Sequence, residues 1–239
     1  MEKLIDIDGN EYQTVQIGNQ IWMAENLRVK HFSDKTPILH APSHEDWLRT
    51  SGKFDKKSLP AWCSYNNELE NEKKYGLLYN YSVISYESGV APVGWRVPEV
   101  KDFEDMFSYL DGKPLPYGFS LLPGKLKAKN EWCDNPFHNE SGFSALPSGS
   151  RFTKLRPTLT ELNWEQYQIA LEESKTFDPI IAFEGLVENC TFWTSSSGRG
   201  CNPMFIFLKN EKDEERDFVL VDYTENIHSG KSIRLIKEN

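Results

Sequence analysis

Several features that would point directly to a function are scarce or missing in this sequence. Its 239 residues include only four cysteines, and no two of them form a C-x-x-C pair. Cysteines this sparse do not make a disulfide scaffold. Basic residues are also in deficit, because 27 Lys and Arg face 36 Asp and Glu and the net charge is −9. This acidic balance argues against nucleic acids and anionic lipids as partners, since both require a basic face.

Long apolar runs are missing as well. No stretch reaches about 18 apolar residues, so we expect no transmembrane segment. The start, Met1 to Asp6, has no apolar signal region. Read literally, the chain is cytoplasmic; the alternative is a leader removed ahead of Met1. Hydrophobic residues nevertheless make up 38% of the chain, which is enough for a real core in one large domain or two small ones.

Metal and disulfide sites have little support in the sequence. His40 and His44 are four residues apart, a spacing that can hold a metal on a helix, but no third ligand is nearby and zinc takes three or four. We therefore predict no metal and no cofactor. The four cysteines are interpreted as small buried residues. One disulfide, between Cys190 and Cys201, is the alternative.

The clearest local pattern lies at about residues 99–110, behind Pro98. Val100, Phe103, Met106, Phe107 and Leu110 share one side of a 3.6-residue helix, and polar residues occupy the other side. Pro98 stands at the entrance, where a missing N–H costs least. The pattern predicts a main amphipathic helix around which the chain folds.

The rest of the chain reads as strands before and after this helical middle. Residues 4–23 predict a β-meander that turns at Asp8-Gly9-Asn10, and Ser43-x-x-Asp46 has the spacing of a capping box. A second capping box, Thr158-x-x-Glu161, opens a predicted helical insertion at 152–189. Further strands are expected at 192–196, 204–209, 218–223 and 230–236. This order favours an α+β fold without βαβ units.

A series of sequence blocks resembles one known family. The blocks run in the same order as in that family and span nearly the whole chain. They are Asp6-x-Asp8-Gly9-Asn10 through Trp22-Met23-Ala24-Glu25-Asn26-Leu27, Tyr65-Asn66-Asn67, Tyr75-Gly76-x-Leu78-Tyr79-Asn80, Gly94-Trp95-Arg96-Val97-Pro98, Gly142-Phe143-x-x-Leu146-Pro147-x-Gly149-x-Arg151, Phe192-Trp193-Thr194-Ser195-Ser196 and Ser232-Ile233-Arg234. Together they resemble the Fibrobacter succinogenes major paralogous domain.

The resemblance implies a fold and a setting. It implies a single domain over 1–239, C-type-lectin-like and related to formylglycine-generating enzymes. Such a domain has mostly antiparallel mixed sheets, paired amino- and carboxy-terminal strands and long irregular loops. Family members are commonly exported or surface-anchored in bacteria, and no activity is established for the family as such. One departure is Glu99, where the family usually has Thr after the Pro; this weakens the helix N-cap.

The first functional hypothesis is a non-catalytic binding domain that recognises a glycan or a protein through loops on a rigid scaffold. Indole faces, amides and guanidinium groups supply the contacts that such ligands need. The predicted ligand-binding residues are Trp132, Asn135, His138, Arg199 and Asn202. For Trp132 the alternative is packing beneath its own loop. We expect a monomer.

Two other functions stay open. One is an enzyme of unknown reaction on a scaffold similar to formylglycine-generating enzymes, although Cys190 and Cys201 are too far apart for the close copper-binding pair of those enzymes. The other is a structural or adhesive surface module. Calcium-dependent sugar binding is disfavoured, because Asp134-Asn135-Pro136 and Cys201-Asn202-Pro203 have the wrong order for the lectin motif and six or more oxygen ligands cannot be assembled. We predict no catalytic residue and lean against an enzyme.

Aromatic and arginine residues within the blocks and the helix are predicted to build the core rather than a site, because aromatic side chains dominate core energetics. These residues are Trp22, Trp95, Arg96, Phe103, Phe107, Trp193 and Arg234.

Overall fold

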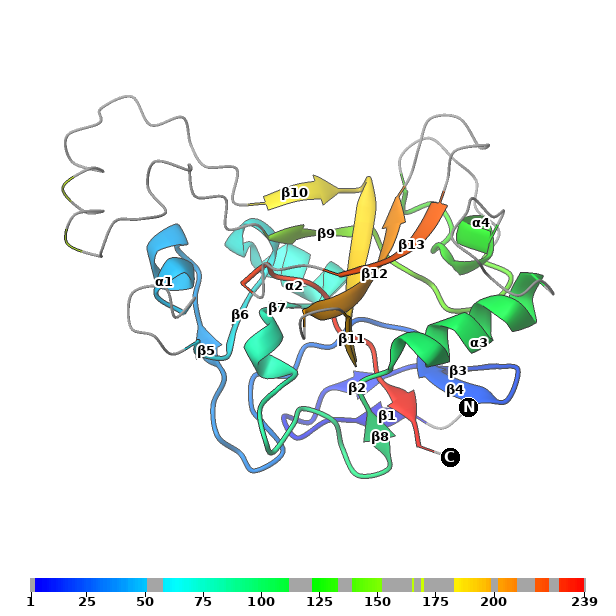
Figure 1. The fold of residues 1–239 in the computed structure, drawn as a ribbon, viewed down its shortest axis with the longest axis horizontal. Helices are drawn as coiled ribbons and strands as arrows, with labels where there is room; N and C mark the ends of the chain where they lie inside the picture. The colour runs from blue at the N-terminus through cyan, green and yellow to red at the C-terminus, as the bar shows by residue number, and fades with distance from the viewer. Residues whose placement is uncertain are drawn as a thin grey trace.

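A computed structural model describes residues 3–50, 58–111, 122–132, 139–151, 165, 169, 183–198, 202–209, 218–223 and 228–238. These residues form a mixed α+β fold in which most strand pairs are antiparallel (Figure 1). The strands make sheets of two, three, four and five members. The predicted α+β class and its mostly antiparallel pairing are confirmed.

The amino-terminal strands follow the predicted turns. β1 (Leu4–Ile5) pairs with β2 (Glu11–Tyr12), and β3 (Thr14–Ile17) pairs with β4 (Gln20–Met23). Gly9, in the first turn, has a φ of +82°, a left-handed conformation that glycine adopts without steric cost. The meander differs from the prediction in one respect, because β2 and β3 belong to different sheets.

Both ends of the chain meet in the four-stranded sheet, whose order is β3-β4-β14-β8. β14 (Ile236–Lys237) lies between β4 and β8 (Trp95–Arg96). Ile236 stands opposite Trp22 on one side and opposite Arg96 on the other. The expected pairing of an amino-terminal strand with the carboxy-terminal strand is therefore present.

The segment before β14 is not the continuous strand predicted over 230–236. Three successive residues from 230 onwards form isolated bridges to Arg151, Tyr79 and Phe192, which belong to different strands. A continuous ladder needs one partner strand, and this segment changes its partner at each step. Only residues 236–237 consequently form a strand, and the segment links the sheets instead.

The largest sheet has the order β10-β9-β11-β12-β13. Its strands are β9 (Ser148–Arg151), β10 (Phe183–Leu186), β11 (Asn189–Ser197), β12 (Pro203–Lys209) and β13 (Phe218–Tyr223).

β10 corrects part of the predicted helical insertion at 152–189. Its residues pair with β9, with Phe183 opposite Arg151, and Phe183 packs on a buried cluster. Pairing with β9 and the packing of Phe183 therefore make residues 183–186 a strand rather than part of a helix. Of 152–182 the structure describes only Glu165 and Ile169, both helical; Thr158 lies outside the described residues.

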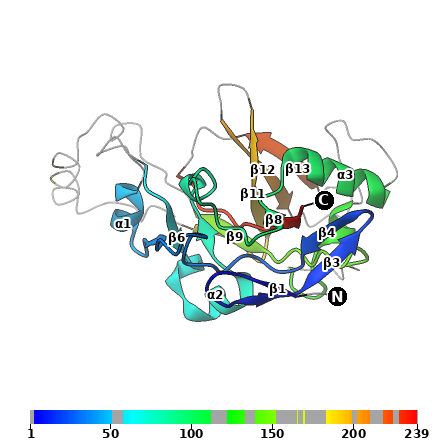
Figure 2. The same ribbon diagram turned by 90° about the horizontal axis from the view of Figure 1, so that it is seen from below.

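A smaller sheet and several short helices complete the described fold. They are β5 (Leu39–His40), β6 (Ala61–Cys63), β7 (Leu78–Tyr79), α1 (His44–Arg49), α2 (Leu69–Tyr75), α4 (Leu122–Leu126) and the 3₁₀ turns η1 (Tyr65–Asn67) and η2 (Tyr81–Val83). The capping box before α1 is confirmed: Ser43 Oγ accepts the Asp46 N–H at 3.0 Å, and Asp46 Oδ2 accepts the Ser43 N–H at 3.4 Å. In Figure 2, α2 and β1 both lie at the lower edge of the view.

The predicted main helix is α3 (Val100–Asp111), and its buried face is the predicted one. Phe103, Met106 and Phe107 are buried, whereas Tyr109 on the other side is exposed. Glu99 stands at the helix entrance in place of the usual Thr. The weaker N-cap is compensated, because the Asp102 carboxylate accepts the N–H of Glu99 at 2.7 Å. The helix packs on β11 and β12, which places it against the largest sheet.

Five of the seven residues assigned to the core are fully buried: Trp22, Phe103, Phe107, Trp193 and Arg234. The Trp22 and Phe103 ring centroids lie 4.8 Å apart, and Trp193 Nε1 donates to the Tyr79 carbonyl at 2.8 Å.

Trp95 and Arg96 are only half-buried, because β8 is an edge strand of its sheet. Arg96 forms a bidentate ion pair with Asp102 of α3, with both N···O distances at 2.7 Å. It joins the sheet to the helix at the surface rather than inside the core.

Two fully buried arginines have the same kind of environment. Arg234 donates to the Asn26 side chain at 2.9 Å and to the carbonyls of Phe143 and Ser144, and its guanidinium lies over the Phe143 and Phe192 rings. Burial lowers the pKa of Arg234 to about 9.

Arg151 donates to three successive carbonyls ahead of α1, those of Ala41, Pro42 and Ser43. Its guanidinium lies 4.5 Å from the Trp47 ring centroid and 4.8 Å from that of Phe183. Each guanidinium thus lies over two aromatic rings and binds the backbone carbonyls of a loop.

Candidate functional site

The residues predicted to bind ligand do not come together in the described part of the chain. Trp132 is buried in the α3 cluster, donates its Nε1–H to the Ala145 carbonyl at 2.9 Å, and has the Lys127 ammonium over its ring. Asn202 is half-buried and its carbonyl accepts the Gly198 N–H in the β11–β12 turn. The other three, Asn135, His138 and Arg199, lie outside the described residues.

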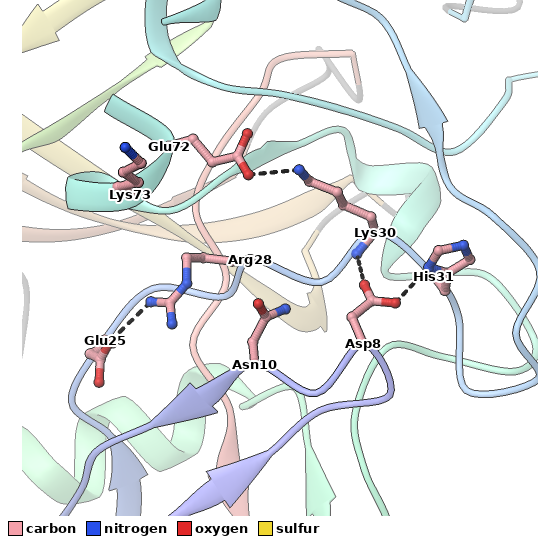
Figure 3. Close-up of a pocket in the computed structure, with 8 residues that line it drawn as sticks. All are labelled: Asp8, Asn10, Glu25, Arg28, Lys30, His31, Glu72 and Lys73. Atoms are coloured by element: carbon pink, nitrogen blue, oxygen red, sulfur yellow. Dashed lines mark hydrogen bonds and ion pairs between the residues drawn. The ribbon is translucent and has the colours of Figure 1, made fainter. Parts of the chain in front are cut away.

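A polar pocket of about 530 Å³ lies elsewhere, between the β1–β2 hairpin, the segment after β4 and α2 (Figure 3). Its lining contains no purely apolar side chain. The lining residues are Asp8, Asn10, Glu25, Arg28, Lys30, His31, Glu72 and Lys73.

The hairpin side of the pocket is organised by one buried carboxylate, that of Asp6. It accepts the backbone N–H of Asp8 at 3.0 Å, the backbone N–H of Asn10 at 2.9 Å and the Tyr12 hydroxyl at 2.6 Å. Burial and the neighbouring Asp6 carboxylate raise the pKa of Tyr12, so its hydroxyl stays a donor. Asp8 and Asn10 are therefore presented from a fixed turn.

The segment after β4 is tied to this turn through its backbone and through His31. Asp8 accepts the Lys30 backbone N–H at 2.5 Å through one carboxylate oxygen and contacts His31 Nδ1 at 2.5 Å through the other. The Tyr12 hydroxyl accepts the Arg28 N–H at 2.9 Å. Arg28, Lys30 and His31 consequently share one rigid stretch of backbone.

Two ion pairs fix the cations of the pocket, one within the segment after β4 and one between this segment and α2. Arg28 contacts Glu25 at 2.9 Å, and Lys30 Nζ contacts Glu72 of α2 at 2.6 Å. Lys30 Nζ also lies 4.6 Å from the Trp62 ring centroid, and the other partner of that ring is His40, stacked at 4.1 Å. Because aromatic faces attract cations, Lys30 is held from two directions.

The sequence pattern did not reveal this pocket. Asp8 and Asn10 were predicted only to form a turn, and between residues 28 and 60 only the Ser43-x-x-Asp46 capping box was recognised. The relevant signal is one acidic residue followed by two basic residues in Glu25-x-x-Arg28-x-Lys30. It indicates a site only once α2 is known to lie opposite this segment.

Other chemistry has little basis among the residues that the structure describes. No group of three or more His, Cys, Asp or Glu side chains in these ranges could hold a metal ion. Cys63 and Cys190 are buried free thiols, and burial raises the pKa of Cys63 to about 11 and that of Cys190 to about 12. The alternative of a Cys190–Cys201 disulfide is therefore wrong. Within the same ranges, no helix combines the length and apolar character needed to cross a membrane.

The fold and the pocket define an α+β domain with a polar surface site. Comparison with protein families identifies the domain further: the Fibrobacter succinogenes major domain matches residues 15–237, and the chain belongs to this family. No curated protein and no solved structure matches the chain.

Proposed function

We propose that this protein is a non-catalytic binding domain that recognises a glycan or a protein at the pocket between the β1–β2 hairpin and α2. We also propose a C-type-lectin-like scaffold and a location at the bacterial surface or outside the cell. The pairing of β14 with β4 and the position of α3 directly after Trp95-Arg96-Val97-Pro98 support the scaffold. The family resemblance supports the location.

One observation carries the binding function: every residue that lines the pocket has a polar or charged side chain, and the pocket is preorganised. Its side chains come from three segments that backbone hydrogen bonds and ion pairs already hold together. A preorganised site loses little conformational entropy when a ligand binds. Carboxylates, an amide, a guanidinium and ammonium groups offer both donors and acceptors, as hydroxyl-rich or peptide ligands require.

The pairing within the pocket favours binding over catalysis. A general acid or base needs a pKa matched to its task and free access to the substrate proton. Here Arg28 is engaged by Glu25, Lys30 by Glu72 and His31 by Asp8. These groups hold one another in place, which suits recognition.

The test is a glycan array with the purified protein and two matched variants. Lys30→Met keeps an unbranched side chain and removes the ammonium that lies over Trp62 and contacts Glu72. Lys101→Met makes the same change in the exposed Lys101–Asp105 pair of α3, outside the pocket. We expect Lys30→Met to weaken the array signal at least about tenfold, as the loss of hydrogen bonds to a charged group does. Lys101→Met should bind like the parent.

Two checks accompany the array. Lys101→Met should unfold at the parental midpoint and Lys30→Met slightly below it, because a partly exposed ion pair contributes about 1 kcal/mol or less. A chelator should leave binding unchanged. Parental binding by Lys30→Met would remove the pocket from the proposal. A calcium-dependent signal would contradict the site described here.

A further inference from the structure

We infer that the pocket selects an uncharged, hydroxyl-rich ligand, a neutral glycan, over an acidic one. The inference rests on the proposed binding function and narrows it. It follows from the way in which charge is distributed and already compensated within the pocket.

The formal charges that line the pocket cancel. Three carboxylates, Asp8, Glu25 and Glu72, face three cations, Arg28, Lys30 and Lys73. The first two cations are paired within the pocket at 2.9 and 2.6 Å, and Lys73 contacts Glu70 at 2.9 Å. An anionic ligand that used one of these cations would place its charge beside the carboxylate already paired there, so its net gain is small.

Lys30 is the cation least able to turn towards an anion. Its ammonium contacts Glu72 and lies over Trp62, while its backbone N–H is bound by Asp8. The Glu72 side chain is only 21% exposed, so the pair is partly shielded from water. Moving the ammonium would give up both the ion pair and the aromatic face.

Hydroxyl groups have no such conflict. An ionised carboxylate has room for about four hydrogen bonds, and a guanidinium has five N–H donors. A ligand hydroxyl can donate to Glu72 or Glu25 and accept from Arg28 while the ion pairs remain intact. Figure 3 shows the Asn10 side chain directed between Arg28 and Lys30; its Nδ2–H donates to the Asp6 carboxylate at 2.9 Å, which fixes the orientation of the amide.

Long-range electrostatics also favour a neutral ligand over an acidic one. The pocket contributes no net positive charge, and the chain as a whole carries −9. An acidic glycan would therefore approach without electrostatic steering. A neutral glycan is indifferent to this field, so its affinity should barely depend on salt.

The experiment compares neutral and acidic probes of equal length by calorimetry. The neutral probes are cellohexaose, xylohexaose and mannohexaose, and the acidic probe is hexagalacturonic acid. We expect at least one neutral probe to bind, with a Kd that changes less than about twofold between about 50 and 500 mM NaCl. The acidic probe should bind at least about tenfold more weakly than this neutral probe, because it makes an unfavourable contact between like charges.

One variant should narrow the predicted preference through a gain of binding, which misfolding cannot mimic. Glu72→Gln leaves the Lys30 ammonium without its carboxylate, so hexagalacturonic acid should bind about three- to fivefold more tightly than it binds to the parent. The matched control, Glu45→Gln, makes the same change in the exposed Glu45–Arg49 pair of α1 and should change nothing.

The outcomes separate the two claims. Stronger binding of hexagalacturonic acid than of every neutral probe would overturn the neutral-glycan inference and leave the binding function standing. Binding of a protein ligand that Lys30→Met weakens, with no glycan binding, would also overturn the inference alone. Probe binding that neither Glu72→Gln nor Lys30→Met alters would overturn both, because the pocket would not be the site.

Discussion

Truncation of Phe103 in α3 should remove a large part of the stability of the domain. Its side chain is fully buried, and its ring centroid lies 4.8 Å from that of Trp22, 6.0 Å from Phe107 and 6.4 Å from Phe143. Phe103→Ala therefore deletes a ring that bridges the helix, β4 and the loop before β9.

The expected cost comes from these contacts. Buried Phe→Ala substitutions cost about 3–5 kcal/mol, and each aromatic pair contributes about 0.5–1.5 kcal/mol beyond its buried area. Because Phe103 has three such partners, we expect a loss in the upper half of that range. Domains of this kind are stable by only about 5–15 kcal/mol, so the variant should be close to the limit of folding.

Guanidinium denaturation followed by tryptophan fluorescence measures the effect as a lower midpoint at an unchanged slope. The matched control is Tyr109→Ala, which removes an aromatic ring from the same helix at a position that is 66% exposed. It should cost less than about 1 kcal/mol, as exposed substitutions do. If Phe103→Ala cost no more than Tyr109→Ala, α3 would not be the element on which the core is built.

Three further predictions test other parts of the molecule. Gly149→Ala should destabilise the protein more than Gly89→Ala, as measured by the two melting temperatures. Both glycines have a φ of +62°, but a Cβ at 149 would lie 2.5 Å from the Glu184 carbonyl oxygen, whereas a Cβ at 89 would touch nothing within 4 Å. Cys63 and Cys190 should resist iodoacetamide at about pH 8 in the folded protein and react after unfolding, because burial raises the pKa of both thiols; peptide mass spectrometry would reveal a reactive native thiol. Burial lowers the pKa of His228 from 6.5 to about 4, so between these pH values the unfolded chain takes up a proton that the folded state does not. Stability should therefore fall as the pH drops through this interval. A His228→Gln variant should lose part of this dependence, and an unchanged slope of stability against pH would contradict the assignment.

The sequence predicted best what depends on near neighbours. The face of α3 and the Ser43–Asp46 capping box were correct because helix periodicity and capping involve residues three or four apart. The Asp8-Gly9-Asn10 turn was correct for the same reason. Family blocks added the pairing of the two chain ends, which no local pattern contains.

Properties that depend on distant segments were not accessible from the sequence. Alternation of residues in 230–236 predicted one strand, but the segment meets a different partner at each bridge. Trp95 and Arg96 were assigned to the core because nothing in the sequence marks β8 as an edge strand. The pocket was missed because Lys30 and Glu72 are 42 residues apart and acquire meaning only as a pair.

The two arginines that hold loop carbonyls also have a consequence for the folding pathway. Arg151 binds carbonyls about 110 positions away in sequence, and Arg234 binds carbonyls about 90 positions away. Contacts of such long range must wait until both segments have been brought together, so they form late. Replacing either arginine by lysine, which lacks the planar fork, should therefore accelerate unfolding and leave the refolding rate almost unchanged. These residues would then govern how long the folded protein lasts rather than how quickly it forms.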